Sequence, residues 1–373
     1  MTDSEAASPD RSGMVAGSGT RLAVLVVVGA LVVALGVTLV VHRSGHQPAG
    51  STARNVPLSV SCPAAGSCVA VDDLGNAVHL VGSAWSRPFH LESANGMSAV
   101  SCATPTFCMA VDTGGQYARF NGRAWSKLHA FDVPVAQRYN LLLGLSGVTA
   151  VSCPTTQFCM AGDVLGKYFT YNGLAWQGPK HVEPVKLLNI DRGAEAAAIV
   201  DVSCTGPHFC AAITARGRAL TWNGTNWSAP DTLVSGLAQT LDQVRLLPGL
   251  AGLSCSSPIQ CVAVSPGGYA YTYDGSAWSP PQSIDTEAAR TGSDEGITAV
   301  SCVTSSFCMA VDGLGRSLDF DGTSWSTPRG VDSALGLNDV SCASPRFCVA
   351  LDDLGEAAVF NGDSWQAPRR IDQ

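Results

Sequence analysis

The chain has 373 residues and a formal net charge of −8, from 22 lysines and arginines and 30 aspartates and glutamates. This length is sufficient for one large domain or two ordinary ones. The acidic balance argues against a nucleic-acid-binding protein, because such proteins present a basic surface to the phosphates.

An uncharged apolar segment comes first in the chain. Residues 22–41 read LAVLVVVGALVVALGVTLVV, and a helix of that length spans roughly 30 Å, the hydrocarbon thickness of a bilayer. A cleaved signal peptide is the main alternative, but its apolar region is usually shorter, about 7–15 residues. We therefore predict a transmembrane helix over 21–43 that acts as a signal anchor. A disordered cytoplasmic tail (1–20) would precede it, and a linker (44–56) would follow it.

The cysteines form a regular pattern beyond this segment. All 14 fall into seven C-x5-C pairs, and none is left over. Such pairing favours disulfides formed in an oxidising compartment, so we predict an extracytoplasmic location for the chain after the anchor. Zinc binding is an alternative, but zinc loops use C-x2–4-C spacing; reduced, buried cysteines are another. The predicted pairs are Cys62–Cys68, Cys102–Cys108, Cys153–Cys159, Cys204–Cys210, Cys255–Cys261, Cys302–Cys308 and Cys342–Cys348.

The cysteine pairs mark an internal repeat of 40 to 51 residues. In one unit we expect four strands: AVSC (99–102), CMAVD (108–112), YARFNG (117–122) and AWSKLHAFD (124–132). A five-residue connection, ATPTF, would separate the first two. The Asn-Gly or Asp-Gly before the last strand is a strong hairpin signal.

Four antiparallel strands in each of seven units predict an all-β fold, a seven-bladed β-propeller over residues 57–373. A linear solenoid is the alternative, but it usually has capping ends, and the last unit here is a full one. Closure of the ring would then depend on packing of the first blade against the seventh. Seven of the eight tryptophans recur at one position of the repeat, and we expect each to fill the space between adjacent blades. An aromatic cage is the alternative role. These tryptophans are Trp85, Trp125, Trp176, Trp227, Trp278, Trp325 and Trp365.

The stretch VDGLGRSLDFDGTSWS (Val311 to Ser326) resembles the Asp-box, or BNR, repeat of sialidase-like propellers. It is also similar to the repeats of photosystem II assembly-factor-type propellers. The shared features are a Gly-x5-(Asn/Asp)-Gly-x2-Trp frame and the preceding strand that ends in Asp. The resemblance implies a propeller over 57–373, in a disulfide-bearing bacterial variant. Sialidase chemistry would need an arginine cluster, but no catalytic set can be assembled from the arginines near blade strands, which are Arg119, Arg216, Arg218 and Arg316.

Acidic residues recur at one position and form a candidate metal site. In five blades an aspartate stands four residues after the second cysteine, and Thr214 and Ser265 replace it in the fourth and fifth blades. Carboxylate oxygens suit a hard cation such as Ca²⁺. We favour an Asx-type turn leading into the next glycine instead, because the two replacements are also turn-forming hydroxyl residues. The candidate residues are Asp72, Asp112, Asp163, Asp312 and Asp352.

The connections between blades vary in length, and those after the second to fifth blades are the longest. They include the leucine-containing segments 133–147, 182–200 and 233–252. Because connections alternate between the two ends of an antiparallel sheet, all crossings lie on one face, opposite the C-x5-C hairpins; we call it the long-crossing face. Insertions on one face often build a binding surface, although loops also tolerate added length at small entropic cost.

Together these patterns predict a single-pass cell-membrane protein with a cytoplasmic N-terminus and an extracytoplasmic propeller. It would bind or scaffold a protein or glycan partner at the cell envelope, on the long-crossing face. A sialidase-like glycoside hydrolase and an assembly factor for other membrane proteins are the alternatives. We predict no catalytic residue, no cofactor and no nucleic-acid partner, and an enzyme is the less favoured class. The pattern leaves the identity of the partner and the oligomeric state open.

Overall fold

The computed structural model describes residues 56–132, 147–183, 198–234, 249–287, 296–331 and 336–371. All of them belong to one compact unit, residues 44–373. The predicted tail and transmembrane helix, and all of the linker but Val56, lie outside the described residues. Within these ranges, no helix has the length and apolar character needed to cross a bilayer.

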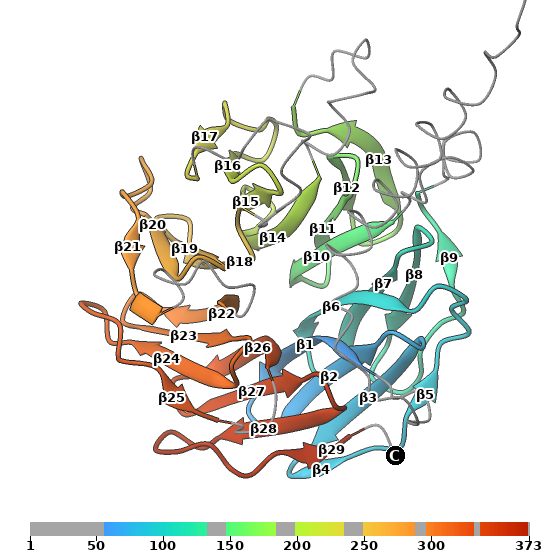
Figure 1. The fold of residues 1–373 in the computed structure, drawn as a ribbon. Helices are drawn as coiled ribbons and strands as arrows, with labels where there is room; N and C mark the ends of the chain where they lie inside the picture. Colours follow the sequence, from blue (N-terminus) through green and yellow to red (C-terminus); the bar gives the residue numbers. More distant parts are fainter. Residues whose placement is uncertain are drawn as a thin grey trace, which may run out of the picture. The chain divides into compact units, whose positions relative to one another are not determined.

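Seven antiparallel sheets follow one another along the chain, and each consists of consecutive strands (Figure 1). Blades 1 to 3 contain β1 (Pro57–Ala64), β2 (Ser67–Asp72), β3 (Asn76–Val81), β4 (Ala84–Trp85), β5 (Phe89–His90); β6 (Met97–Thr104), β7 (Phe107–Asp112), β8 (Gln116–Phe120), β9 (His129–Ala130); and β10 (Val148–Thr155), β11 (Phe158–Asp163), β12 (Lys167–Tyr171), β13 (Trp176–His181). Blades 4 to 7 contain β14 (Ile199–Gly206), β15 (Phe209–Thr214), β16 (Arg218–Trp222), β17 (Asp231–Thr232); β18 (Gly252–Ser257), β19 (Gln260–Ser265), β20 (Tyr269–Tyr273), β21 (Gln282–Ser283); β22 (Ile297–Thr304), β23 (Phe307–Asp312), β24 (Arg316–Phe320), β25 (Arg329–Gly330); and β26 (Leu337–Ser344), β27 (Phe347–Asp352), β28 (Glu356–Phe360), β29 (Arg369–Arg370). The predicted seven-bladed propeller is therefore confirmed.

The first two strands of each blade are longer than predicted. In blade 2, β6 and β7 continue past the cysteines, and only residues 105–106 connect them. Cys102 and Cys108 are therefore directly opposite residues of two paired strands, and not the ends of an irregular loop. All seven predicted disulfides are formed, and each joins the first two strands of a single blade.

The outermost strand is shorter than predicted in most blades. The tryptophan forms only an isolated bridge to the third strand, and a two-residue strand follows later, as in blade 2 with Trp125 and β9. A serine follows the tryptophan in five of the seven blades. In blade 2, Ser126 Oγ accepts the amide hydrogen of Arg119 and donates to the carbonyl oxygen of Lys127. Blade 7 has a glutamine at this position and keeps the interruption, whereas in blade 3, with Gln177, β13 extends over six residues.

The core lies between the blades. One cluster joins Val69 and Val71 of blade 1 to Val100 and Trp125 of blade 2. We call such a contact zone between two adjacent blades a seam, and the seams that follow are built in the same way. The predicted role of the tryptophans is confirmed at several seams. Trp125 Nε1 donates to His79 Nε2 of the preceding blade at 2.9 Å, and Trp365 Nε1 donates to Ser317 Oγ of the preceding blade at 3.0 Å.

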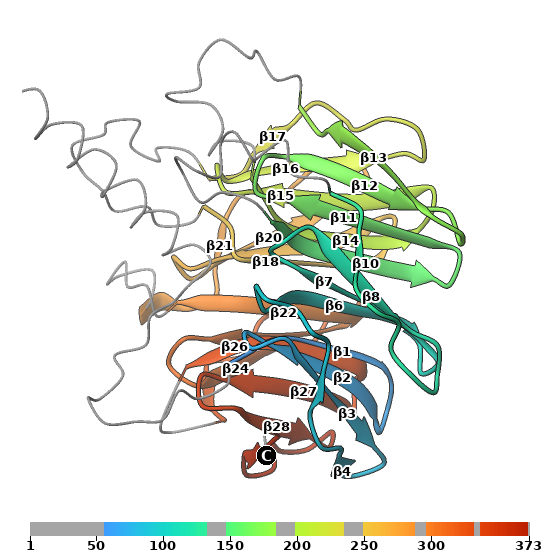
Figure 2. The same ribbon diagram turned by 90° about the vertical axis from the view of Figure 1, so that its right-hand side faces the viewer.

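The ring closes by packing of blade 7 on blade 1, as predicted. Val60 and Cys62 of blade 1 share a core cluster with Val349 and Leu351 of blade 7. Figures 1 and 2 show their innermost strands, β1 and β26, side by side, although they lie near opposite ends of the described chain. No strand is exchanged between the two blades, because each sheet contains strands of one repeat alone.

A ring of hydrogen bonds joins the innermost strands at every seam. The serine before the first cysteine of each blade accepts the amide hydrogen of the first cysteine of the next blade, at 2.8 to 3.0 Å. Cys62 N–H donates to Ser341 Oγ across the closing seam, in the same way as the others. We call this ring the serine ladder. Its acceptors are Ser61, Ser101, Ser152, Ser203, Ser254, Ser301 and Ser341.

Candidate functional site

The five predicted metal-site aspartates stand at the ends of the second strands, one to a blade, and each is at most 5% exposed. Their carboxylates accept hydrogen bonds from backbone amides of the turn that follows. Asp312 Oδ1, for example, accepts from the amide groups of Leu314 at 3.0 Å and Arg316 at 2.8 Å. Asp72, Asp163 and Asp352 repeat this pair of bonds, and Asp112 makes the second of them.

This geometry is the Asx-type turn that the sequence favoured over a metal site. Ser265 in blade 5 supports the same turn, because its Oγ accepts the amide hydrogen of Tyr269 at 3.4 Å. Across the described ranges, no three His, Cys, Asp or Glu side chains gather closely enough to hold a metal ion. Burial raises the pKa of Asp72, Asp112 and Asp312 above the usual value, and that of Asp163 to about 6.

Two of these turns are part of ion pairs that cross a blade seam, a feature that sequence reasoning missed. Lys167 Nζ lies 3.2 Å from Asp163 of its own blade and 3.2 Å from Asp132 of the preceding blade. All three side chains are less than one-tenth exposed. Burial alone would lower the pKa of Lys167, but the two carboxylates outweigh this effect and raise it. The ammonium group is therefore held charged between two blades.

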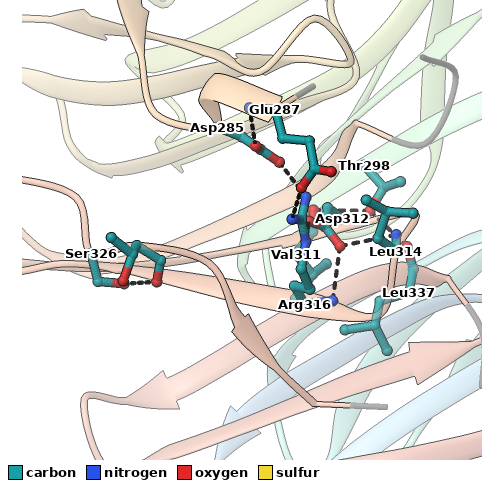
Figure 3. Close-up of polar contacts among 10 residues, drawn as sticks. Asp285, Glu287, Thr298, Val311, Asp312, Leu314, Arg316, Ser326 and Leu337 are labelled. Atoms are coloured by element: carbon teal, nitrogen blue, oxygen red, sulfur yellow. Dashed lines mark hydrogen bonds and ion pairs between the residues drawn. The ribbon is translucent and has the colours of Figure 1, made fainter. Parts of the chain in front are cut away.

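Arg316 makes the corresponding contact between blades 5 and 6 (Figure 3). Its guanidinium group lies 2.7 Å from Asp312, 2.6 Å from Asp285 and 3.0 Å from Glu287. Asp285 and Glu287 belong to the segment that leaves blade 5. Arg218 and Glu183 form a third pair of this kind, at 2.6 Å, between blades 4 and 3.

The cations and anions of these pairs hold matching positions. Lys167, Arg218 and Arg316 each begin the third strand of a blade. Their carboxylate partners in the preceding blade also hold one position, directly after the apolar residue whose amide donates to the carbonyl oxygen of that blade's turn glycine: Asp132, Glu183 and Asp285. Most of 133–147, 182–200 and 233–252 lies outside the described residues, so the binding role of these segments stays a prediction.

The innermost strands carry two further carboxylates, at the same position of the repeat in blades 4 and 7. Asp201 Oδ2 accepts the amide hydrogen of Leu253 at 2.9 Å, and Asp339 Oδ2 accepts that of Val60 at 2.8 Å. Both bonds cross a seam, two residues before the serine ladder. Burial raises the pKa of Asp201 to about 7 and that of Asp339 to about 6, and the charge of Asp339 adds to the effect on Asp201.

The arginines considered for sialidase chemistry do not come together. Arg119 is exposed on the outer part of blade 2, Arg216 is exposed on a turn of blade 4, and Arg218 and Arg316 form ion pairs at two different seams. A groove of about 290 Å³ between blades 6 and 7 instead joins Phe360 and Trp365 to the exposed pair of Arg329 and Asp319. The arrangement offers apolar and charged contact surface, without an arginine triad.

Comparison with known proteins supports the fold. No protein-family model matches the chain, and no curated protein matches it. Three similar solved structures are described here. YCF48 bound to D1 peptide has a TM-score of 0.58 and 14% identity, over 84% of this chain and 95% of that chain. YCF48 from Cyanidioschyzon merolae has a TM-score of 0.58 and 16% identity, over 85% and 99%. The computationally designed Ika8 protein has a TM-score of 0.52 and 10% identity, over 85% and 87%. At these identities the likeness is one of fold.

Proposed function

We propose that this protein is a membrane-anchored, extracytoplasmic scaffold that binds a protein partner on its long-crossing face. One observation carries the proposal. Three of the four long crossings start beside a carboxylate that is ion-paired to the following blade, at Asp132, Glu183 and Asp285. The starting points of these segments are thereby fixed on a rigid ring, which is how propellers and other scaffolds position variable loops for recognition.

Two further facts support a protein partner. One of the similar solved structures is a YCF48 propeller with a D1 peptide bound, so this fold accommodates a peptide ligand. The arginines that a sialidase-like site would need are spread over three blades, which does not favour the hydrolase alternative. The anchor rests on the uncharged segment 22–41, and seven disulfides support an oxidising compartment.

Crosslinking from native membranes tests the binding face. One variant replaces 134–145, 186–195 and 237–246 with short Gly-Ser linkers and keeps the ion-paired residues. A control variant carries Ile259→Ser, an exposed residue of the opposite face. We expect the intact protein and the control to capture the same partner and the linker variant to lose it. Equal capture by all three proteins would contradict the proposal. Deletion of residues 1–43 tests the anchor separately, and we expect it to move the protein to the soluble fraction.

A further inference from the structure

Basic residues are segregated on the outer layer of three adjacent blades. This layer runs from the third strand to the end of the fourth and comprises residues 76–90, 116–130 and 167–181 of blades 1 to 3. These ranges contain six lysines and arginines and four histidines, but no aspartate or glutamate. The matching ranges of blades 4 to 7 contain Asp231, Asp274, Asp319, Asp321, Glu356 and Asp363. The separation is notable in a chain with a net charge of −8.

Five of the six cations are exposed, and we call them the basic edge: Arg87, Arg119, Arg123, Lys127 and Lys180. Among the ion pairs of the described chain, none includes a member of this set. The sixth cation, Lys167, is buried in the seam between blades 2 and 3, where Asp132 and Asp163 neutralise it. The charge of the basic edge is thus not balanced by carboxylates of its own layer, and it attracts anionic groups from solution.

The same layer offers backbone and apolar contacts. Strands β5, β9 and β13 are the last of their sheets and lie outermost in Figure 1, so among the described residues one edge of each has no neighbouring strand. Three large apolar residues are exposed in this layer: Val81 at 75%, Phe89 at 50% and Leu174 at 89%. An exposed strand edge can pair with an added extended segment, whose side chains then select the partner.

We propose that the basic edge binds an extended, acidic segment of a partner protein. Glutamate and aspartate side chains complement the five cations, and intervening apolar side chains meet the exposed Phe89 and Leu174. Successive blades are turned about the axis of the ring, so the charges of blades 1 to 3 face different directions. A flexible chain follows such a curved surface, whereas a flat bilayer meets only part of it. The residues of this surface precede the crossing of their own blade in the chain, and none of them belongs to the segments 133–147, 182–200 or 233–252.

Fluorescence anisotropy of the full-length protein in detergent tests the assignment. The probe is a labelled peptide in which glutamate alternates with valine or serine, and its glutamine counterpart is the uncharged reference. One variant carries Arg119→Glu, Arg123→Glu and Lys127→Glu in blade 2. The matched control carries Arg329→Glu, Arg346→Glu and Arg369→Glu, with the same change in net charge at other sites. We expect the blade 2 variant to bind the acidic peptide at least about tenfold more weakly than the control, and added salt to weaken wild-type binding.

Two results would overturn the proposal. Equal losses in the two variants would show that net charge, and not the basic edge, governs binding. Loss of binding to phosphatidylglycerol vesicles with unchanged peptide binding would assign the edge to a lipid surface instead. Thermal unfolding of both variants checks that the fold is intact. A variant with shortened crossings should bind the peptide as the wild type does, so a failure of the scaffold proposal would be distinguishable from a failure of this one.

Discussion

The polar contacts between adjacent blades are uniform on the inner side of the ring and variable on the outer side. On the inner side, a serine binds the amide of the next blade's cysteine at all seven seams, including the closing one. On the outer side, the contact changes from seam to seam. Ser93 donates directly to Asp112 between blades 1 and 2, whereas Lys167 and Arg316 occupy the same region as paired cations further along. The uniform part closes the ring, and the variable part lies where the long crossings begin.

The largest effect is expected from the variable part. Substitution of Arg316→Ala leaves Asp285 and Asp312 without their cation, and their side chains are at most 1% exposed. Breaking a buried ion pair from one side typically costs about 3 kcal/mol or more. We therefore expect a loss of about 3 kcal/mol in the free energy of unfolding, measured by denaturant titration. Arg329→Ala is the control, because its ion pair is exposed, and it should cost less than about 0.5 kcal/mol. Similar costs for both substitutions would show that the outer seams contribute little to stability.

The carboxylates next to the serine ladder should make stability depend on pH. The pKa of Asp201 is about 7 in the folded protein, against about 3.9 in an unfolded chain. Its contribution to stability is complete below the unfolded value and is lost as the pH rises through 7. We expect the free energy of unfolding to fall by about 3 kcal/mol from pH 4 to pH 7 through this group. Substitution of Asp201→Asn should flatten the profile, as followed by thermal unfolding, and an unchanged slope would contradict the assignment.

Removal of one disulfide tests the blades rather than the seams. The double substitution Cys102→Ala and Cys108→Ala frees the unfolded chain from one local crosslink. The chain-entropy model gives a cost of about 2 kcal/mol for such a short loop. Because every disulfide is confined to one blade, we expect the same cost from the pair Cys255 and Cys261. Denaturant titration of the two double variants checks this equality, and a large difference would mean that a disulfide also influences its neighbouring seam.

The smallest effect is expected from single steps of the serine ladder. Ser341→Ala removes the acceptor for the amide of Cys62 at the closing seam, and Ser152→Ala does the same for Cys204 inside the ring. Each change should cost about 1 kcal/mol. Equal costs would show that the closing seam is built like the others. A much larger cost for Ser341→Ala would show that closure depends on this bond in particular, and hydrogen exchange of the two amides would locate the change.

The fold followed from the sequence because its determinants repeat. The C-x5-C spacing predicted the disulfides, and the recurrent tryptophan predicted the packing between blades. The serine ladder carried an equally regular signal, since a serine precedes the first cysteine in every unit, but its meaning became clear only from the arrangement of adjacent blades. The seam ion pairs carried no such signal. Asp285 and Arg316 lie 31 residues apart, and the pairing depends on the crossing that brings blades 5 and 6 together.

The candidate site was less predictable for a related reason. The recurrence of Asp72 and its equivalents allowed either a common ligand or a repeated turn, and the fold itself spreads such a position around the ring. The same symmetry that makes a residue conspicuous in the sequence separates its copies in space. Local turn geometry at Asp312 was accordingly the better interpretation. Charge segregation in blades 1 to 3 became visible only when residues were sorted by layer.

The serine ladder has a directional character, since each blade donates to the one before it and accepts from the one after it. Each unit therefore supplies both a serine acceptor and a cysteine amide donor, and the first and last blades need no special contact. Duplication of one unit in the gene would add a blade that already carries the donor and the acceptor for its two neighbours. The chain termini can also be moved to another crossing, with residues 56 and 371 linked, and the hydrogen bonds of the serine ladder would be kept. A circularly permuted protein that begins at blade 4 would therefore form the same ring of seven blades.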